Sequence, residues 1–555
     1  MASKPDFTKV KVFVPVGSLG TGVRASEVNA AIERGMDVIA PDAGSTDSGA
    51  AYLATGTSKN SRGAVKADLL LLMAAQQTTK VPLIVGTAGQ AGGDLNVDWT
   101  MDIVLEIAHE HRYRPKIAVL YSEQSAATIK AKNAAGKVRP LPPLGPLRDQ
   151  TIDECRHIVA LMGPEPYIAA LAGGADIIIG GRSTDTAVLA SFPLWKGVPV
   201  APSWHAGKIG ECGSQCTANT SLGSGVLLTI DTEGFEVEPL HGANRCTVHS
   251  VSAHMLYENS NPFRLIEPGG VLDVSAAKYE QVTDTRVRVT GSTWHPQPYT
   301  MKLEGAAGGR YQTIMIIGIA DPLELSNLDL FHDKMHHALV QRVRRTMGEA
   351  AGKFDISLRI YGWNAMSGRP VPKDTPPPRE VGVMCVITAE TQDLATQMAK
   401  ACNPYFFHMP LFDGLEIPSY GSSSITWLSL TIRWNLSARS GSICQAQPQR
   451  NLRVPKLRDV CRHVRSKVAG PFWVTIDLLF DGEENYRRYH DNVAIGPDAL
   501  AKIYGTDPSL VAIYPVESLN MIKISYPRAM PQGGVVERDL HSGQQYVYLL
   551  DVEMV

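Results

Sequence analysis

The chain has 555 residues, more than one hydrophobic core usually organises, so we expect two to four domains. With 44% hydrophobic and 19% charged residues, its composition is that of a folded globular protein. The net charge of −2 lacks the basic excess by which proteins bind nucleic acids or anionic membranes, so we expect neither as a partner.

The cysteines and the N-terminus indicate a cytoplasmic protein. Eight cysteines in 555 residues are too sparse for a disulfide framework, so reduced thiols are expected. The polar stretch Met1–Lys9 runs directly into a predicted strand and is not typical of a secretory signal. No segment approaches the roughly 18 apolar residues of a membrane span. We further expect a small-molecule substrate and a homo-oligomer.

Short apolar runs alternate with helical patterns over residues 10–191. Strands are expected at Val10–Val16, Asp37–Ala40, Val81–Val85, Lys116–Tyr121 and Ala175–Ile179. Helices are expected at Ala25–Arg34, Arg62–Gln76, Asp98–Glu110, Thr151–Leu161 and Thr184–Ser191. Apolar strands separated by helices are typical of a parallel sheet covered on both faces. The sequence therefore predicts an α/β fold with a doubly wound, mostly parallel sheet.

The pattern changes after residue 230. Further elements are expected at Arg286–Thr290, Thr313–Ile319, Leu323–Met347, Ile356–Tyr361, Val381–Ala389 and Thr391–Cys402, in an order that resembles part of a ferredoxin-like α+β layer. Residues 421–454 lack periodicity and are interpreted as a linker. A small α+β unit follows, with elements at Phe472–Phe480, Pro497–Tyr504 and Met521–Ser525. The expected domains are therefore 1–230, 231–420 and 455–555.

Polar or glycine-rich loops follow four of the predicted strands. Because ligands of open α/β sheets bind at the carboxyl ends of the strands, we expect these loops to form the site. The candidates are Asp42, Asp47 and Glu123 for catalysis, and Ser45, Thr46, Gly89, Arg182 and Asp185 for substrate binding.

Each of these choices has a structural alternative. Asp42 and Asp47 flank a turn, where aspartate is also a preferred cap. The glycine loop around Gly89 suits an anion, but it is neither a Walker A loop nor a clean dinucleotide motif, and it can simply turn the chain. Arg182 is a natural fork for a substrate carboxylate, whereas an Arg182–Asp185 surface pair is the alternative.

Glu211 and Cys212 form a further candidate pair. Glu211 suits a general base and Cys212 a thiol nucleophile, although buried cysteines more often only pack. Cys212 and Cys216 have a C-x-x-x-C spacing, but a second close pair, which a structural zinc site needs, is absent. We therefore assign no metal ligand and leave the cofactor open, with a divalent metal ion as one option.

The stretch Cys246–Glu258 predicts a helix. His254 and Glu258 are four residues apart, so they would share a face with Ser250. A histidine held by a carboxylate is what general acid or base chemistry needs. The alternative is a satisfied interior polar cluster. We select His254 and Glu258 as catalytic candidates.

Ordered motifs make most of the chain resemble a known family. They include Pro41-Asp42-Ala43-Gly44-Ser45-Thr46-Asp47-Ser48-Gly49, Gly181-Arg182-Ser183-Thr184-Asp185, Glu211-Cys212-Gly213, Ser252-Ala253-His254-Met255-Leu256-Tyr257-Glu258, Glu267-Pro268-Gly269-Gly270 and Lys302-Leu303-Glu304-Gly305. Over residues 10–415 they resemble the AtuA (acyclic terpene utilisation) family. The resemblance implies an α/β body and a place in the degradation of branched acyclic terpenes. Lys302, in the last motif, is a further substrate-binding candidate.

The last hundred residues resemble a different family. Arg465-Ser466-Lys467, Ala469-Gly470-Pro471-Phe472 and Thr475-Ile476-Asp477 are similar to the small uncharacterised protein often encoded beside AtuA-type proteins. Here the two are one polypeptide. The resemblance implies that the small unit packs on the large one and completes its site.

Three functions are consistent with these residues. The first is a lyase (hydration or dehydration) or isomerase acting on a small branched carboxylic acid or its CoA thioester. The second is a thioester or acyl hydrolase with Cys212 or Ser250 as nucleophile. The third is a non-catalytic scaffold of a multienzyme pathway.

Overall fold

The computed structural model describes residues 9–48, 50–141, 145–307, 309–412, 421–422, 454–533 and 537–554. The chain forms two compact units, one made of Met1–Gly308, Arg453–Gln532 and His541–Val555, and the other of Gly309–Leu452 and Gly533–Leu540. The domain boundaries expected from the sequence stay a prediction. The linker expected over 421–454 lies almost entirely outside the described residues.

A nine-stranded sheet organises the first unit. In spatial order its strands are β11 (Lys278–Thr283), β12 (Arg286–Thr290), β8 (Gly234–Pro239), β7 (Val226–Ile230), β1 (Val10–Val14), β2 (Val38–Ile39), β3 (Leu83–Val85), β6 (Ile177–Gly180) and β4 (Ile117–Leu120). The five strands from β1 to β4 in this order are parallel, and the other four continue the sheet with antiparallel pairings. The predicted α/β class is confirmed.

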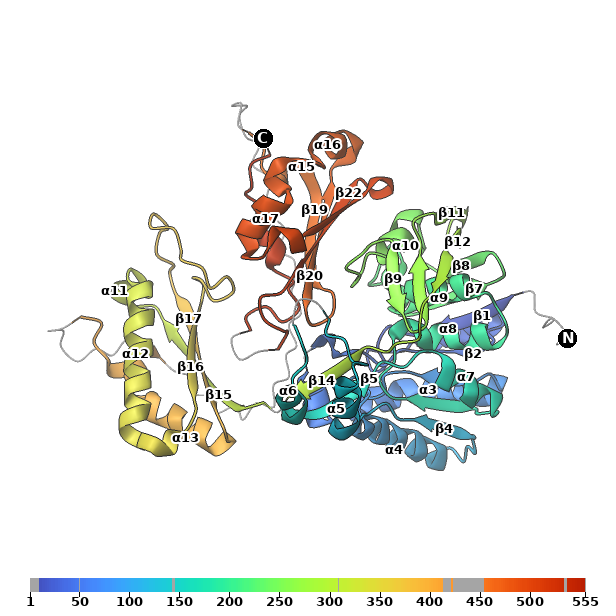
Figure 1. The fold of residues 1–555 in the computed structure, drawn as a ribbon, viewed down its shortest axis with the longest axis horizontal. Helices are drawn as coiled ribbons and strands as arrows, with labels where there is room; N and C mark the ends of the chain where they lie inside the picture. Colours follow the sequence, from blue (N-terminus) through green and yellow to red (C-terminus); the bar gives the residue numbers. More distant parts are fainter. Residues whose placement is uncertain are drawn as a thin grey trace. The chain divides into compact units, whose positions relative to one another are not determined.

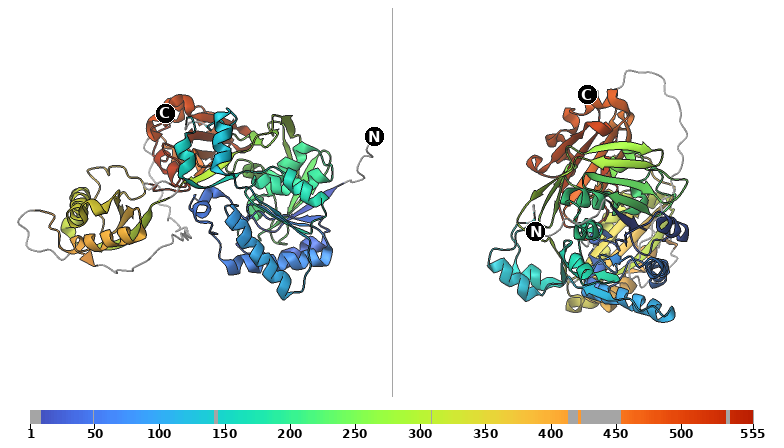
Figure 2. Two further views of the ribbon diagram at one scale, coloured as in Figure 1. Left: turned by 60° about the horizontal axis from the view of Figure 1, so that its bottom comes forward. Right: turned by 90° about the vertical axis from the view of Figure 1, so that its right-hand side faces the viewer.

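Alternate residues of the parallel strands fill two separate cores, one on each face of the sheet. On one face, Val12 and Ile178 pack among α7 (Glu165–Ala172), α8 (Asp185–Trp195) and α9 (Val200–Gly210). On the other, Phe13 and Ile177 pack among α1 (Ala25–Glu33), α3 (Arg62–Thr79) and α4 (Asp94–Glu110). The two sets of helices lie on opposite sides of the sheet (Figure 2). Burial on both faces explains why these strands are apolar throughout.

One predicted helix is wrong. In place of Thr151–Leu161 the structure has a short helix α6 (Asp149–Glu154) followed by strand β5 (Cys155–Ala160). The strand pairs antiparallel with β14 (Leu303–Ala307), from Leu303↔Ala160 to Ala307↔Cys155. The apolar end of β5 is buried by a partner far along the chain, which the local periodicity could not show.

Smaller elements complete this unit. They are α2 (Ala51–Thr55), α5 (Ala126–Ala134), α10 (Val248–His254) and an antiparallel sheet of β9 (Arg264–Glu267), β10 (Gly270–Asp273) and β13 (Thr293–Pro296). Among the described residues, no helix combines the length and the apolar character needed to cross a membrane.

The second unit has the α+β arrangement expected from the sequence. Its elements are β15 (Tyr311–Ile319), α11 (Pro322–Leu325), α12 (Leu328–Met347), β16 (Asp355–Tyr361), β17 (Val381–Ala389), α13 (Gln392–Cys402), α14 (Tyr405–His408) and β18 (Gly421–Ser422). The sheet order β16-β17-β15-β18 is antiparallel throughout, as in a ferredoxin-like layer. Helices α12 and α13 pack on the sheet through one apolar core (Figure 1).

The C-terminal segment of the first unit forms a second α+β module. It contains α15 (Leu457–Val460), β19 (Cys461–Val468), β20 (Trp473–Phe480), α16 (Gly482–Tyr489), α17 (Pro497–Tyr504), β21 (Ala512–Val516) and β22 (Met521–Pro527). Its sheet order is β19-β20-β22-β21, and the module has its own apolar core. A smaller apolar cluster joins Leu479 and Met521 of the module to Leu256 and Phe263, which follow α10.

Candidate active site

Five carboxyl groups, two of them buried and three half-buried, interact beside the carboxyl ends of the parallel strands. We call them the acidic cluster: Asp42, Asp47, Asp185, Glu211 and Glu258. Asp42 comes shortly after β2 and forms a parallel bridge to Gly86, which follows β3. Asp185 begins α8 after β6. The cluster therefore occupies the edge of the sheet where α/β proteins bind ligands.

Asp42 is held as a carboxylic acid. Burial raises its pKa well above the ordinary value, and repulsion from Asp185 raises it further. The Gly44 N–H donates to Oδ2 at 3.1 Å. The other oxygen, Oδ1, is buried without a hydrogen-bond partner in the described part of the chain. A raised pKa favours the protonated form of Asp42, which can act as a proton donor.

Asp47 and Glu258 form a hydrogen-bonded pair with opposite pKa shifts. Burial, followed by the charge of Glu258, raises the pKa of Asp47 well above its ordinary value. Burial also opposes the charge of Glu258, but Lys467 and the hydrogen bond from Asp47 lower its pKa to about 2. The pair therefore holds one proton on Asp47 and a carboxylate on Glu258.

The backbone that presents Glu258 is strained, and the predicted helix is shorter than expected. Helix α10 covers only Val248–His254, because the chain leaves the helix after the cap residue Met255. Glu258 has φ +58°, in the left-handed region that non-glycine residues rarely adopt. Within the described residues no hydrogen bond joins His254 and Glu258, although the charge of Glu258 acts on the His254 ring. Strain of this kind gathers at functional sites.

Lys208 is a cation that the sequence did not single out. It lies near the end of α9, and its Nζ donates to Glu211 Oε1, three residues on. Both side chains are 5% exposed. Burial raises the pKa of Glu211 to about 8 even beside this lysine. A lysine in the predominantly apolar segment 200–210 was the available signal.

Arg182 is held by two carboxylates. Its Nε donates to Glu304 at 3.0 Å and its Nη1 to Asp185 at 3.1 Å. Lys302 lies 2.8 Å from Glu304, and the Thr46 hydroxyl donates to the same carboxylate at 2.9 Å. Arg182, Lys302, Thr46 and Asp185 are therefore brought together, with Glu304 as the central acceptor that the sequence analysis missed.

The C-terminal module contributes Lys467 to this site. Lys467, on β19, donates to Glu258 Oε1 and to the Tyr257 hydroxyl. On β22 of the same module, buried Lys523 donates to the Leu256 carbonyl at 2.8 Å and to Asp477 at 3.0 Å. These bonds hold the strained segment after α10 from the side of the module.

Comparison with known families agrees with this division of the chain. The family model described as "Acyclic terpene utilisation family protein AtuA" matches residues 68–425. The chain belongs to this family. Residues 457–553 match a domain of unknown function, DUF4387, so the chain is a fusion of the two. Neither a curated protein nor a solved structure matches it.

In the part of the first unit that precedes the C-terminal module, residues 1–308, which we call the AtuA body, Cys212 and His254 lie close enough to Glu211 to share a ligand with it. One ligand atom each of Glu211, Cys212 and His254 lies within 4.8 Å of the others. Burial, followed by the charge of Glu211, raises the pKa of the Cys212 thiol well above its ordinary value. Cys216 is instead buried against Cys246.

The structure links three other candidates to local partners. Glu123 accepts from the Asp94 N–H at 2.8 Å and lies 3.1 Å from His157 Nδ1. Gly89 has φ +62°, and a Cβ there would lie 2.7 Å from the Asn96 carbonyl oxygen, so glycine serves the turn. The Ser45 hydroxyl accepts from the Asp47 N–H at 3.3 Å and shapes the Asp47 loop. Their roles in a site stay predictions.

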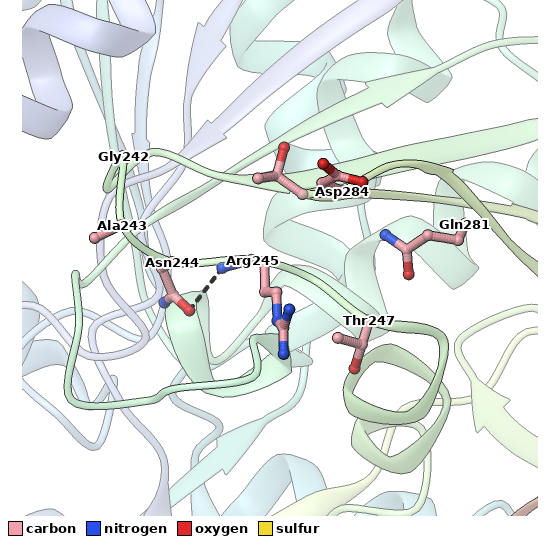
Figure 3. Close-up of a pocket in the computed structure, with 8 residues that line it drawn as sticks. Gly242, Ala243, Asn244, Arg245, Thr247, Gln281 and Asp284 are labelled. Atoms are coloured by element: carbon pink, nitrogen blue, oxygen red, sulfur yellow. Dashed lines mark hydrogen bonds between the residues drawn. The ribbon is translucent and has the colours of Figure 1, made fainter.

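An open depression of about 450 Å³ lies elsewhere on the AtuA body (Figure 3). Its lining residues are Gly242, Ala243, Asn244, Arg245, Thr247, Gln281, Asp284 and Thr285. None of the candidate residues lines it. The Asn244 side-chain oxygen accepts from the Arg245 N–H at 2.8 Å, so part of this lining is a self-contained turn.

Proposed function

We propose that the chain is a lyase or isomerase that acts on a small branched carboxylic acid or its CoA thioester. The observation that carries the proposal is the Asp47–Glu258 pair, whose environments push two neighbouring carboxyl groups to opposite protonation states. Such divergence assigns an acid and a base. Dehydration needs one group to remove the proton beside the carbonyl and another to protonate the hydroxyl that leaves as water, and hydration is the reverse. Isomerisation needs a proton to be removed from one carbon and delivered to another.

In this proposal Glu258 is the base and Asp47 the acid, while Asp42 supplies a second protonated carboxyl group. The cations Lys208 and Lys467, which lower the pKa of Glu258, would stabilise negative charge that develops on the substrate. Arg182 Nη2 makes no hydrogen bond to the described residues and is free for a substrate carboxylate. The family name, acyclic terpene utilisation, favours a branched acyclic acid. We further propose a cytoplasmic homo-oligomer.

Deuterium exchange tests the reaction class directly. Purified full-length protein is incubated in D₂O with unsaturated and 3-hydroxy branched acids and their CoA thioesters, and products are followed by NMR. We expect solvent deuterium at the carbon next to the carbonyl, together with interconverted products. Glu258→Gln and Asp47→Asn should each reduce the rate by about 10²-fold or more. Glu33→Gln, on the exposed side of α1, is the matched control and should leave it unchanged. Absence of exchange with every compound would contradict the proposal.

The hydrolase alternative has less support. Ser250 forms a capping box: its hydroxyl accepts from the Thr247 N–H at 3.0 Å, and its own N–H donates to Thr247 Oγ1 at 3.0 Å. The raised pKa of Cys212 disfavours the thiolate that would attack a thioester. A covalent acyl adduct that disappears in Cys212→Ala would restore this alternative. The scaffold alternative predicts that Asp42, Arg182 and His254 variants leave pathway flux unchanged.

A further inference from the structure

Glu211, Cys212 and His254 come together from two separate segments. Glu211 and Cys212 directly follow α9, and His254 is the last residue of α10. Their ligand atoms lie within 4.8 Å of one another. A nitrogen, a sulfur and an oxygen donor at this spacing can share one metal ion.

Each of the three side chains keeps a donor atom that makes no hydrogen bond to the described residues. His254 is 5% exposed, and its Nε2 is buried without a hydrogen-bond partner among the described residues. A buried polar atom without a partner is energetically unfavourable, so such atoms are rare in folded proteins unless a ligand or water satisfies them. Lys208 bonds Oε1 of Glu211, whereas no hydrogen bond of the described chain uses Glu211 Oε2 or the Cys212 sulfur.

The local structure fixes these donors in place. Gly17 packs against the backbone of Cys212. A Cβ atom added to Gly17 would lie only 2.5 Å from the Cys212 carbonyl oxygen. The Tyr257 ring stacks on His254 with centroids 5.6 Å apart and an interplanar angle of 17°.

We propose that Glu211, Cys212 and His254 bind a divalent transition metal ion of the Zn²⁺ type. A mixed nitrogen, sulfur and oxygen set suits Zn²⁺, whereas Mg²⁺ and Ca²⁺ prefer oxygen alone. Three protein ligands leave a fourth position open, which is typical of catalytic rather than structural zinc. Cys212 itself is half-buried, whereas Glu211 and His254 are buried.

The use of the fourth position rests on the proposed function. A bound ion would polarise a carboxylate or thioester oxygen as a Lewis acid. The charge of Glu258 acts on all three side chains, so the proposed base lies within electrostatic reach of the ligand set. The metal site would thus combine substrate binding and proton transfer in one place.

Metal content tests the proposal without any assay of turnover. Full-length protein, freed of any affinity tag, is dialysed against Zn²⁺ and analysed by mass spectrometry for metal per chain. The Co²⁺ form is examined for the absorption band of a thiolate–cobalt bond. We expect one metal per chain and a cobalt band that disappears in Cys212→Ser. His254→Gln should lower metal affinity at least tenfold, as judged by competition with a chelator.

Matched controls separate the site from general effects of substitution. Cys155→Ser on β5 and His249→Gln on the exposed side of α10 should keep the metal and the cobalt band. Circular dichroism establishes that each variant is folded. Substoichiometric metal, or equal loss in the control variants, would overturn the proposal. Metal binding without turnover would support the metal site and count against the proposed reaction. Turnover that is unaffected by metal removal would support the reaction and count against the metal site.

Discussion

Glu267 is a buried carboxyl group, 5% exposed, at the end of β9. The Thr186 hydroxyl donates to its Oε1, while Oε2 is buried without a partner in the described part of the molecule. Burial raises its pKa from 4.5 to about 7. The folded protein therefore keeps a proton that the unfolded chain releases above pH 4.5. The contribution of Glu267 to stability is complete below that pH and is lost as the pH rises towards 7.

Substitution of Glu267 tests this dependence. Urea unfolding between pH 5 and 8 should show the free energy of unfolding of the wild type falling with pH, with Glu267 contributing up to about 1.4 kcal/mol per pH unit. Glu267→Gln has no carboxyl proton to lose and should flatten the dependence of the free energy of unfolding on pH. The control variant Glu33→Gln should keep the slope of the wild type. An equal slope in Glu267→Gln and wild type would mean that other groups cause it.

Arg182 gives a second prediction for a single residue. Its fork bonds Glu304 and Asp185 through two different nitrogens, a geometry that lysine cannot reproduce. Arg182→Lys should therefore destabilise the protein, and Arg182→Ala should cost about 3–5 kcal/mol, because buried Glu304 and half-buried Asp185 each lose their bond to the guanidinium. Denaturant unfolding measures both. Lys196→Ala, on the half-buried C-cap of α8, is the comparison and should change the midpoint little.

Single residues also show how far the sequence could define the site. Asp42, Asp47, Arg182 and Asp185 could be selected because their types carry chemistry and their loops follow predicted strands. Glu211 was selected beside Cys212, and Glu258 by its spacing from His254. The sequence did not indicate Lys208, Glu304 or Lys467. Their importance comes from burial or from partners that are distant along the chain. Glu304 accepts a hydrogen bond from Arg182, 122 residues away in the sequence, and Lys467 donates to Glu258, 209 residues away. Periodicity and spacing carry no information at that range.

Helix α10 is short, so its N-cap has a large influence on the elements that present the site. Thr247 Oγ1 accepts from the Ser250 N–H, and the seven-residue helix ends at His254. Thr247→Ala should cost about 1 kcal/mol and fray the helix, with a loss of activity as His254 and Glu258 lose their positions. Ser61→Ala removes the corresponding cap of the long helix α3 and should cost similar stability while sparing activity. Thermal unfolding and steady-state kinetics separate the two effects.

At the same scale, the sequence defined elements well where local pattern and burial agree. The helix over Pro497–Tyr504 has the predicted bounds, with proline at its first position and glycine directly after it. Predictions failed where the partner is distant along the chain. The segment of β5 was predicted as part of a helix, but it forms a strand because it pairs with β14. They also failed where a helix ended without a breaker, since the chain leaves α10 through Met255 with no glycine or proline.

For the whole molecule, the fusion places a DUF4387 module against the AtuA body in one compact unit. The contact is polar as well as apolar: Ser525 donates to the Ser260 carbonyl at 2.7 Å, and Gln532 donates to the Asp47 carbonyl at 2.7 Å. Backbone groups on both sides of the acidic cluster are thus held by the module. The implied completion of the site by the small unit is consistent with these bonds.

Lys467 provides the test at this scale. Burial opposes the charge of Glu258, and the ammonium of Lys467 is the largest of the effects that lower its pKa. Removing that charge in Lys467→Met should raise the pKa of Glu258, so a base that is now ionised down to about pH 2 would become protonated at higher pH. The acidic limb of the kcat/KM profile should therefore move upward in pH, with a lower plateau. Lys502→Met, on the exposed side of α17 in the same module, should leave the profile unchanged. A lower plateau with an unmoved limb would mean that Lys467 only holds the module in place and does not set the ionisation of Glu258.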